Sequence, residues 1–131
     1  SDQLETIGWP EFADTVRATL ESLPADERDT AVVFTQHYGE AGALEWYGLG
    51  RPVFSGHNAF GDWGPPPEGA GPVIVIGLAD PGANFTDCHT TAMINNDAGA
   101  DNEERGRPIW VCSAPQGGWA EQWPRLVHLD A

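Results

Sequence analysis

The unbroken apolar run PVIVIGLA, residues 72–79, constrains the fold of this chain more than any other stretch. A strand that is apolar at every position is buried on both faces, as in a parallel sheet with helices on either side. A helix that spans a bilayer needs about 18 apolar residues in a row, more than any run in this sequence. The run therefore predicts a central strand of an α/β protein.

Segments with helical and with strand patterns alternate along the rest of the chain. Over residues 9–23, apolar side chains recur at helical spacing. Pro10 suits the first position of that helix, and Pro24 ends it. Short apolar strands are expected at 30–35, 51–55 and 108–113, a helical turn and then a strand within 85–94, and helices at 40–48 and 119–129.

This alternation predicts the fold class. A chain of 131 residues has room for one hydrophobic core and not for two, so residues 1–131 are expected to form a single domain. Alternating strands and helices are typical of an α/β protein. We expect a three-layer, Rossmann-like sandwich around a mostly parallel or mixed sheet of about four to five strands.

The charge balance excludes several functions. The chain has 20 Asp and Glu residues against six Arg residues and no lysine, which gives a formal net charge of -14. Nucleic acid is therefore not an expected partner, because phosphate contacts need a basic face. The missing lysine also excludes Schiff-base chemistry and a P-loop.

Cys88 and Cys112 leave two alternatives open, a disulfide or a pair of buried free thiols. A disulfide would close a loop of about 24 residues and stabilise the domain by roughly 3 kcal/mol through loop entropy. A metal site would need closer Cys and His spacing, which only Cys88-His89 approaches. We favour the disulfide, which places the domain outside the cytoplasm.

Ligands of open α/β sheets bind at the loops that follow the carboxyl ends of the strands. The expected loops are residues 36–40, 55–58, 78–82 and 113–118. Side chains able to bond a ligand gather in or near the first two loops, and we expect them to converge on one edge of the sheet. They are His37, Tyr38, Glu40, His57, Asn58 and Asp62.

Chemical interpretations of this cluster compete with a structural one. His37 and His57 with a carboxylate would suit a metal ion, and His37 with Glu40 would suit acid and base catalysis. The interpretation that we favour places Glu40 in the first turn of a helix, where the helix dipole stabilises an anion. That charge would repel a pyrophosphate, and the turn YGEAGAL lacks the GxGxxG pattern of dinucleotide sites. We therefore expect no catalytic residue, no metal and no cofactor.

Six tryptophans raise the alternative of a carbohydrate-binding module. Most tryptophans in small domains pack in the core or at its rim. Trp63, in a loop rich in Gly and Pro, is the strongest candidate for exposure. The other candidates for a stacking surface are Trp46, Trp110, Trp119 and Trp123.

The strings YGEAGAL, SGHN, WGPP and NEERGRPIWVC follow one another within residues 24–129. Their order and spacing resemble the C-terminal soluble domain of bacterial membrane glycosyltransferases of the dolichyl-phosphate-mannose protein mannosyltransferase type (family thirty-nine), relatives of the lipid A aminoarabinose transferase. The positions that match the family's signature are Tyr38, Gly39, Glu40, Ser55, Gly56, His57, Asn58, Trp63 and Gly64.

The resemblance implies that this chain is an accessory domain of a membrane enzyme. In the family, such an extracytoplasmic α/β domain follows a bundle of transmembrane helices, and the enzyme takes a sugar from a polyprenyl-phosphate donor. This chain lacks the spans and the outer loop with the family's acidic catalytic residues, so the resemblance implies an accessory domain that is not catalytic alone. The extracytoplasmic location also supports the disulfide.

We therefore expect a domain cut from a polytopic protein, at the extracytoplasmic face of a bacterial cell membrane. Its partners would be the transmembrane region of its own full-length chain and a polyprenyl-phosphate sugar or glycan acceptor, faced by loops 37–40 and 55–64. The alternatives are a free-standing hydrolase or metal-dependent enzyme, with His37, His57, Glu40 and Asp62, and a carbohydrate-binding module.

Overall fold

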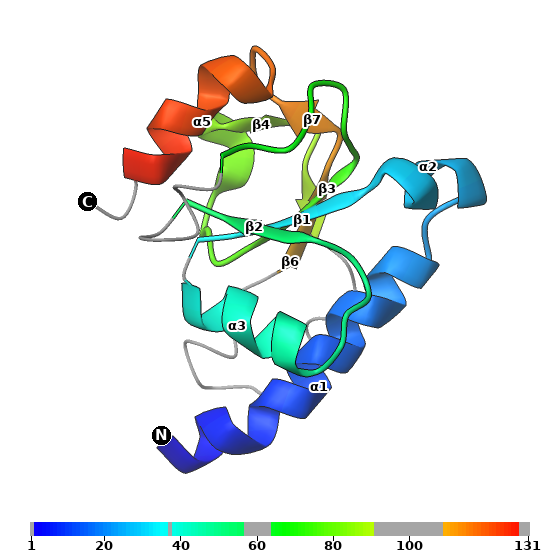
Figure 1. Cartoon of the computed structure of the whole chain (residues 1–131), viewed down its shortest axis with the longest axis vertical. Helices are drawn as coiled ribbons and strands as arrows, with labels where there is room; N and C mark the ends of the chain where they lie inside the picture. Colours follow the sequence, from blue (N-terminus) through cyan, green and yellow to red (C-terminus); the bar gives the residue numbers. More distant parts are fainter. Residues whose placement is uncertain (1, 37, 57–63, 91–108, 129–131) are drawn as a thin grey trace.

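The computed structural model describes residues 2–36, 38–56, 64–90 and 109–128 (Figure 1). Helices and short strands alternate along these residues, and each predicted strand of the main sheet contains an observed one. None of the described helices combines the length and the apolar character of a membrane span. The elements are α1 (Asp2–Glu21), α2 (Ala25–Thr30), β1 (Val32–Thr35), α3 (Tyr38–Trp46), β2 (Val53–Ser55), β3 (Val73–Ile76), the 3-10 turn η1 (Pro81–Ala83), β4 (Phe85–Thr86), β5 (His89–Thr90), β6 (Ile109–Cys112), β7 (Ala114–Pro115) and α5 (Trp119–His128).

The main sheet is mixed. Its five strands lie in the order β2-β1-β3-β6-β5, and β4 and β7 form a separate two-stranded sheet. Strand β1 runs parallel to both β2 and β3, whereas β6 runs antiparallel to both β3 and β5. The α/β class is confirmed. A mixed sheet of about four to five strands is also confirmed: two of its four pairings are parallel and two are antiparallel, and of the five strands β6 alone runs against the others.

Two predicted details along the chain also differ. Pro10 lies inside α1, which begins before residue 9, and not at the first helical position. A proline ring provides no N–H, so α1 lacks one internal hydrogen bond there. The helical turn expected after residue 85 lies earlier, at η1, where the Asp80 carboxylate accepts a hydrogen bond from the Gly82 N–H at 3.0 Å.

Burial on both faces of the sheet divides the core into two apolar clusters. Strand β3 is buried at all four positions, as its sequence predicts, and its side chains alternate between the clusters. Ile74 and Ile76 pack with the apolar faces of α1 and α3, whereas Val73 and Val75 pack with α5. Figure 1 shows α1 and α3 on one side of the sheet and α5 on the other. Each buried valine or isoleucine contributes about 1.5–3 kcal/mol.

Four aromatic rings form the centre of the cluster under α5. Phe34 of β1 packs against Phe85 of β4 and Trp123 of α5, with ring centroids 5.9 Å and 6.1 Å away. Trp119 completes the ring, 6.0 Å from Phe85 and 6.3 Å from Trp123. Such pairs contribute about 0.5–1.5 kcal/mol each beyond the area that they bury. They hold α5 and the two-stranded sheet to the same face of β1.

Cys88 and Cys112 form a disulfide, as predicted. The pairs Thr86↔Ala114 and His89↔Val111 belong to one antiparallel register, in which Cys88 lies directly opposite Cys112. Their Cα atoms are 4.0 Å apart. The bond therefore joins two neighbouring strands at the point where the chain passes from the main sheet into the two-stranded sheet.

Candidate functional site

The carboxyl ends of β1, β2 and β3 meet at one edge of the sheet, here called the carboxyl edge. These strands are parallel neighbours, so the chain leaves all three at the same edge, at Gln36, Gly56 and Gly77. The first three predicted loops therefore begin at one edge of the sheet, and the convergence of the predicted side chains stays a prediction. The fourth loop, 113–118, lies at the opposite edge, because β6 is antiparallel to β3. Placing that loop with the others was wrong.

The predicted site residues divide into two groups. Glu40 belongs to the first turn of α3, as the structural interpretation required, and Tyr38 and Gly39 precede it in that helix. Ser55 is the last residue of β2, and Gly56 follows it. Gly64 begins the next described stretch. The other predicted site residues lie outside the described residues: His37, His57, Asn58, Asp62 and Trp63.

Two buried hydroxyl groups lie side by side at the carboxyl edge. Thr35 and Ser55 are partners in the register of β1 and β2, and both residues are fully buried. Each lies two positions after a valine of the cluster beneath α3, so both side chains point to the α3 face. Sequence reasoning missed Thr35, although a polar residue at the end of the apolar run VVFT was a signal for it.

The Glu40 carboxylate lies over the gap between β1 and β3. A Cβ atom on Gly77 would lie 2.8 Å from Glu40 Oε1 and 3.0 Å from Gln36 Cβ, and the φ of Gly77 is +93°. The Gln36 N–H donates to the Ile76 carbonyl at 3.0 Å, which joins the two strand ends. In the order β2-β1-β3, the chain reverses direction across the sheet between β1 and β3, the usual position of a ligand crevice. A carboxylate at that point disfavours a bound phosphate.

Gly56 is explained by packing. A Cβ atom at this position would lie 2.6 Å from the carbonyl oxygen of Leu126 and 3.1 Å from Cα of Val127. The end of β2 therefore approaches the backbone of α5 more closely than any side chain would allow. This glycine of the SGHN string fixes how α5 lies on the sheet, and only a residue without Cβ fits there.

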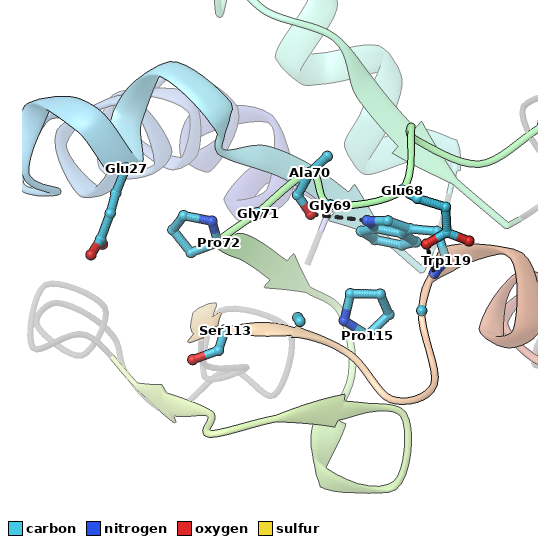
Figure 2. A pocket seen from close by; sticks show the side chains of 11 residues that line it. Glu27, Glu68, Gly69, Ala70, Gly71, Pro72, Ser113, Pro115 and Trp119 are labelled. Carbon is cyan, nitrogen blue, oxygen red and sulfur yellow. Dashed lines mark hydrogen bonds between the residues drawn. The ribbon is translucent and has the colours of Figure 1, made fainter.

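A groove lies at the opposite, amino edge of the sheet (Figure 2). It has a volume of about 570 Å³, and its walls come from α2, from the segment before β3, from the segment after β6 and from the start of α5. Sequence reasoning missed it, because its residues are scattered along the chain and carry no motif. They are Glu27, Glu68, Gly69, Ala70, Gly71, Pro72, Ser113, Ala114, Pro115, Gly118 and Trp119.

Hydrogen bonds hold the wall of this groove rigid. The Trp119 indole N–H donates to the Ala70 carbonyl at 3.0 Å. Thr30 binds Gly71 twice, because its hydroxyl donates to the Gly71 carbonyl at 2.6 Å and its carbonyl accepts from the Gly71 N–H at 3.0 Å. At the far side, the Glu68 carboxylate accepts from the backbone N–H groups of Trp119 and Ala120, at 2.9 Å and 2.8 Å. Glu68 thereby caps the start of α5.

The described tryptophans give little support to a broad stacking surface. Trp119 and Trp123 are buried in the core, and Trp110 is half-buried with its indole N–H donated to the Leu78 carbonyl at 3.1 Å. Trp46 alone among these four is largely exposed, at 82%. It lies at the last position of α3, beside the partly exposed Tyr47.

Within the described stretches, no group of three or more His, Cys, Asp and Glu side chains is arranged to hold a metal ion. The disulfide also withdraws both cysteines from metal ligation. Several arginines instead bind backbone carbonyls: Arg51 donates to the carbonyls of Arg28 and Ala31 at 2.9 Å and 2.8 Å, and Arg17 donates to that of Tyr47 at 3.0 Å. Arg51 thereby binds the carboxyl end of α2, and Arg17 of α1 binds the residue that follows α3.

The chain was compared with protein-family models, with curated proteins and with solved structures, and none of the three comparisons found a match.

Proposed function

We propose that this chain is an accessory extracytoplasmic domain of a membrane glycosyltransferase that uses a polyprenyl-phosphate sugar. Its carboxyl edge faces the active site within the membrane and shapes the entrance for donor or acceptor. The domain does not catalyse the transfer by itself. Its partners are the transmembrane region of the full-length chain and the lipid-linked sugar or glycan acceptor.

The observation that carries this proposal is the position of the two strings that resemble the family's signature. Glu40 and Ser55 belong to strings that are separated in the sequence, and the parallel pairing of β1 with β2 brings both to the carboxyl edge. Buried hydroxyl groups at Thr35 and Ser55 give this edge a polar floor. Its carboxylate disfavours a bound nucleotide, which agrees with an enzyme class that uses a lipid-linked sugar.

The disulfide supports the extracytoplasmic part of the proposal. Disulfides persist in oxidising environments and are rare in the bacterial cytosol. Cys88 and Cys112 lie opposite each other in one register, so the bond requires no rearrangement of the strands. An oxidising location on the outer face of the membrane therefore suits this domain.

We also infer a Rossmann-like, three-layer arrangement. The parallel order β2-β1-β3 is the order of the first three strands of flavodoxin-like sheets. The helices on both sides of the sheet agree with three layers. Strand β6, which is antiparallel to its neighbours, and β5 beyond it would then be an addition at one side of that parallel unit.

A photo-cross-linking experiment tests the proposed orientation. The photoreactive residue p-benzoylphenylalanine is introduced into the full-length protein at Ala79, exposed at the carboxyl edge, and in a matched variant at Ala25, exposed on α2 near the amino edge. We expect cross-links from position 79 to the transmembrane region or to the lipid-linked sugar, and none from position 25. A full-length protein without transmembrane spans, or equal cross-linking from both positions, would contradict the proposal.

The exposed side chain of Trp46 supports a second candidate function, that of a carbohydrate-binding module. An indole that is 82% exposed at the end of a helix offers a flat face on which a sugar ring can stack. This candidate predicts that oligosaccharides change the tryptophan emission of the domain, and that Trp46→Ala abolishes the change. Unchanged emission of the unmodified domain at millimolar sugar would contradict it.

A further inference from the structure

We propose that the groove at the amino edge binds a partner polypeptide through an arginine side chain. The proposal does not depend on the glycosyltransferase assignment, because the groove lies at the edge opposite the carboxyl edge. Its volume of about 570 Å³ falls within the range of roughly 300–1,000 Å³ that is usual for ligand sites in proteins.

The charge of the lining indicates a cationic occupant. Glu27 and Glu68 are the only ionisable side chains among the lining residues, and both residues are exposed. Figure 2 shows them at opposite ends of the groove, with Pro72 and Pro115 between them. An acidic groove in a chain of net charge -14 repels phosphates and carboxylates, and it attracts cations over several ångströms.

The free hydrogen-bonding capacity of the two lining carboxylates also favours a cationic ligand. The lining donors Trp119 Nε1 and Gly71 N are already bound to protein carbonyls, and the Gly71 carbonyl accepts from the Thr30 hydroxyl, whereas the exposed Ser113 hydroxyl can both donate and accept. Each Glu68 oxygen accepts one backbone N–H, and a carboxylate has about four acceptor sites in all. Glu27 and Glu68 therefore retain acceptor capacity, which suits a ligand with several N–H donors.

The apolar part of the lining selects the rest of the ligand. Pro72 and Pro115 present saturated rings without hydrogen-bonding groups, and the three-carbon stem of an arginine can lie along such a surface while its head group stays polar. The planar guanidinium can then donate two parallel hydrogen bonds to one carboxylate. A sugar is less suited, because the indole of Trp119 is 1% exposed and offers no stacking face.

The test uses the 131-residue domain and a synthetic peptide, acetyl-Gly-Pro-Arg-Pro-Gly-amide, followed by backbone amide NMR. We expect the peptide to shift the resonances of Gly69, Gly71 and Gly118, and not those of Gly56 and Gly77 at the carboxyl edge. The matched peptide with citrulline in place of arginine has the same shape without the charge, and it should bind at least about fivefold more weakly, equivalent to about 1 kcal/mol.

Substitutions in the domain then test whether the arginine of the peptide binds next to Glu27. Glu27→Gln is the first choice, because no hydrogen bond of the Glu27 side chain holds the described fold together, and we expect it to weaken binding of the arginine peptide about fivefold. Glu45→Gln, exposed on α3, is the matched control and should leave binding unchanged. Equal binding of the citrulline peptide, shifts confined to the carboxyl edge, full binding by Glu27→Gln, or no shift at millimolar peptide would each overturn the proposal.

Discussion

Glu68, in the loop before β3, caps the first turn of α5 at Trp119, a residue 51 positions later in the sequence. Its two carboxylate oxygens bind the N–H groups of Trp119 and Ala120, which no earlier turn of the helix can satisfy. An anion there also interacts favourably with the positive end of the helix dipole. A side chain of one loop thus fixes the direction of the helix that completes the aromatic core.

Replacing Glu68 by alanine is therefore expected to lower the free energy of unfolding by about 1 kcal/mol, within the range of roughly 0.5–2 kcal/mol for lost helix caps. Urea unfolding followed by far-UV circular dichroism measures the change. Glu27→Ala removes the same charge from the other end of the groove and should change stability by less than about 0.5 kcal/mol. Equal losses for the two variants would show that overall charge, and not capping, is responsible.

Gly56→Ala is expected to destabilise the domain by about 1–3 kcal/mol, because the new methyl group would lie 2.6 Å from the Leu126 carbonyl oxygen. Neither atom belongs to a flexible side chain, so α5 or β2 must shift. The midpoint of thermal unfolding reports the effect.

Gly42→Ala is the matched control for that substitution. Gly42 lies within α3 and has no atom within 4 Å of an added Cβ, so alanine should stabilise the helix by about 0.5–1 kcal/mol. Opposite signs at the two glycines are expected. Destabilisation at both glycines would contradict the explanation, because an added methyl group would then be unfavourable even where it meets no other atom.

The disulfide is expected to contribute about 3 kcal/mol, since it closes a loop with a sequence separation of 24 residues. The double variant Cys88→Ser, Cys112→Ser should unfold at a lower urea concentration, with a free energy of unfolding lower by about 3 kcal/mol. Reductant should destabilise the unmodified domain similarly and leave the double variant unchanged. Two thiols that react with an alkylating agent in unreduced, denatured protein, seen by intact mass, would contradict the bond itself.

The sequence predicted those features that depend on local pattern. The apolar run around Val75, the strands at β1, β2 and β6, and the disulfide were all expected and are observed. The parallel pairing of β1 with β2 also followed, because a helix, α3, joins these two consecutive strands. The helix-start position of Glu40 followed from its place just after a strand.

The features that the sequence could not predict depend on long-range pairing. An apolar strand reads the same in either direction, so nothing in PIWVCS indicated that β6 runs antiparallel to β3. That direction alone moves Ser113 and Pro115 from the carboxyl edge to the amino edge, where they complete a groove with Glu68. The close approach of Gly56 to α5 likewise depends on a contact between distant segments.

Asp87 provides the last prediction, because it is the one non-glycine residue in the described part of the chain with a positive φ, at 52°. It is exposed between β4 and β5, where the chain passes from the two-stranded sheet into the main sheet, next to Cys88. Aspartate tolerates this conformation better than most residues, and a β-branched side chain tolerates it poorly. Asp87→Val is therefore expected to lower the free energy of unfolding by about 1–2 kcal/mol. Asp87→Gly removes the side chain without the backbone strain and should leave stability unchanged or slightly raised, as measured by urea unfolding. If both variants lose the same stability, the Asp87 carboxylate itself stabilises the link between β4 and β5, and the explanation by backbone strain at a positive φ is wrong.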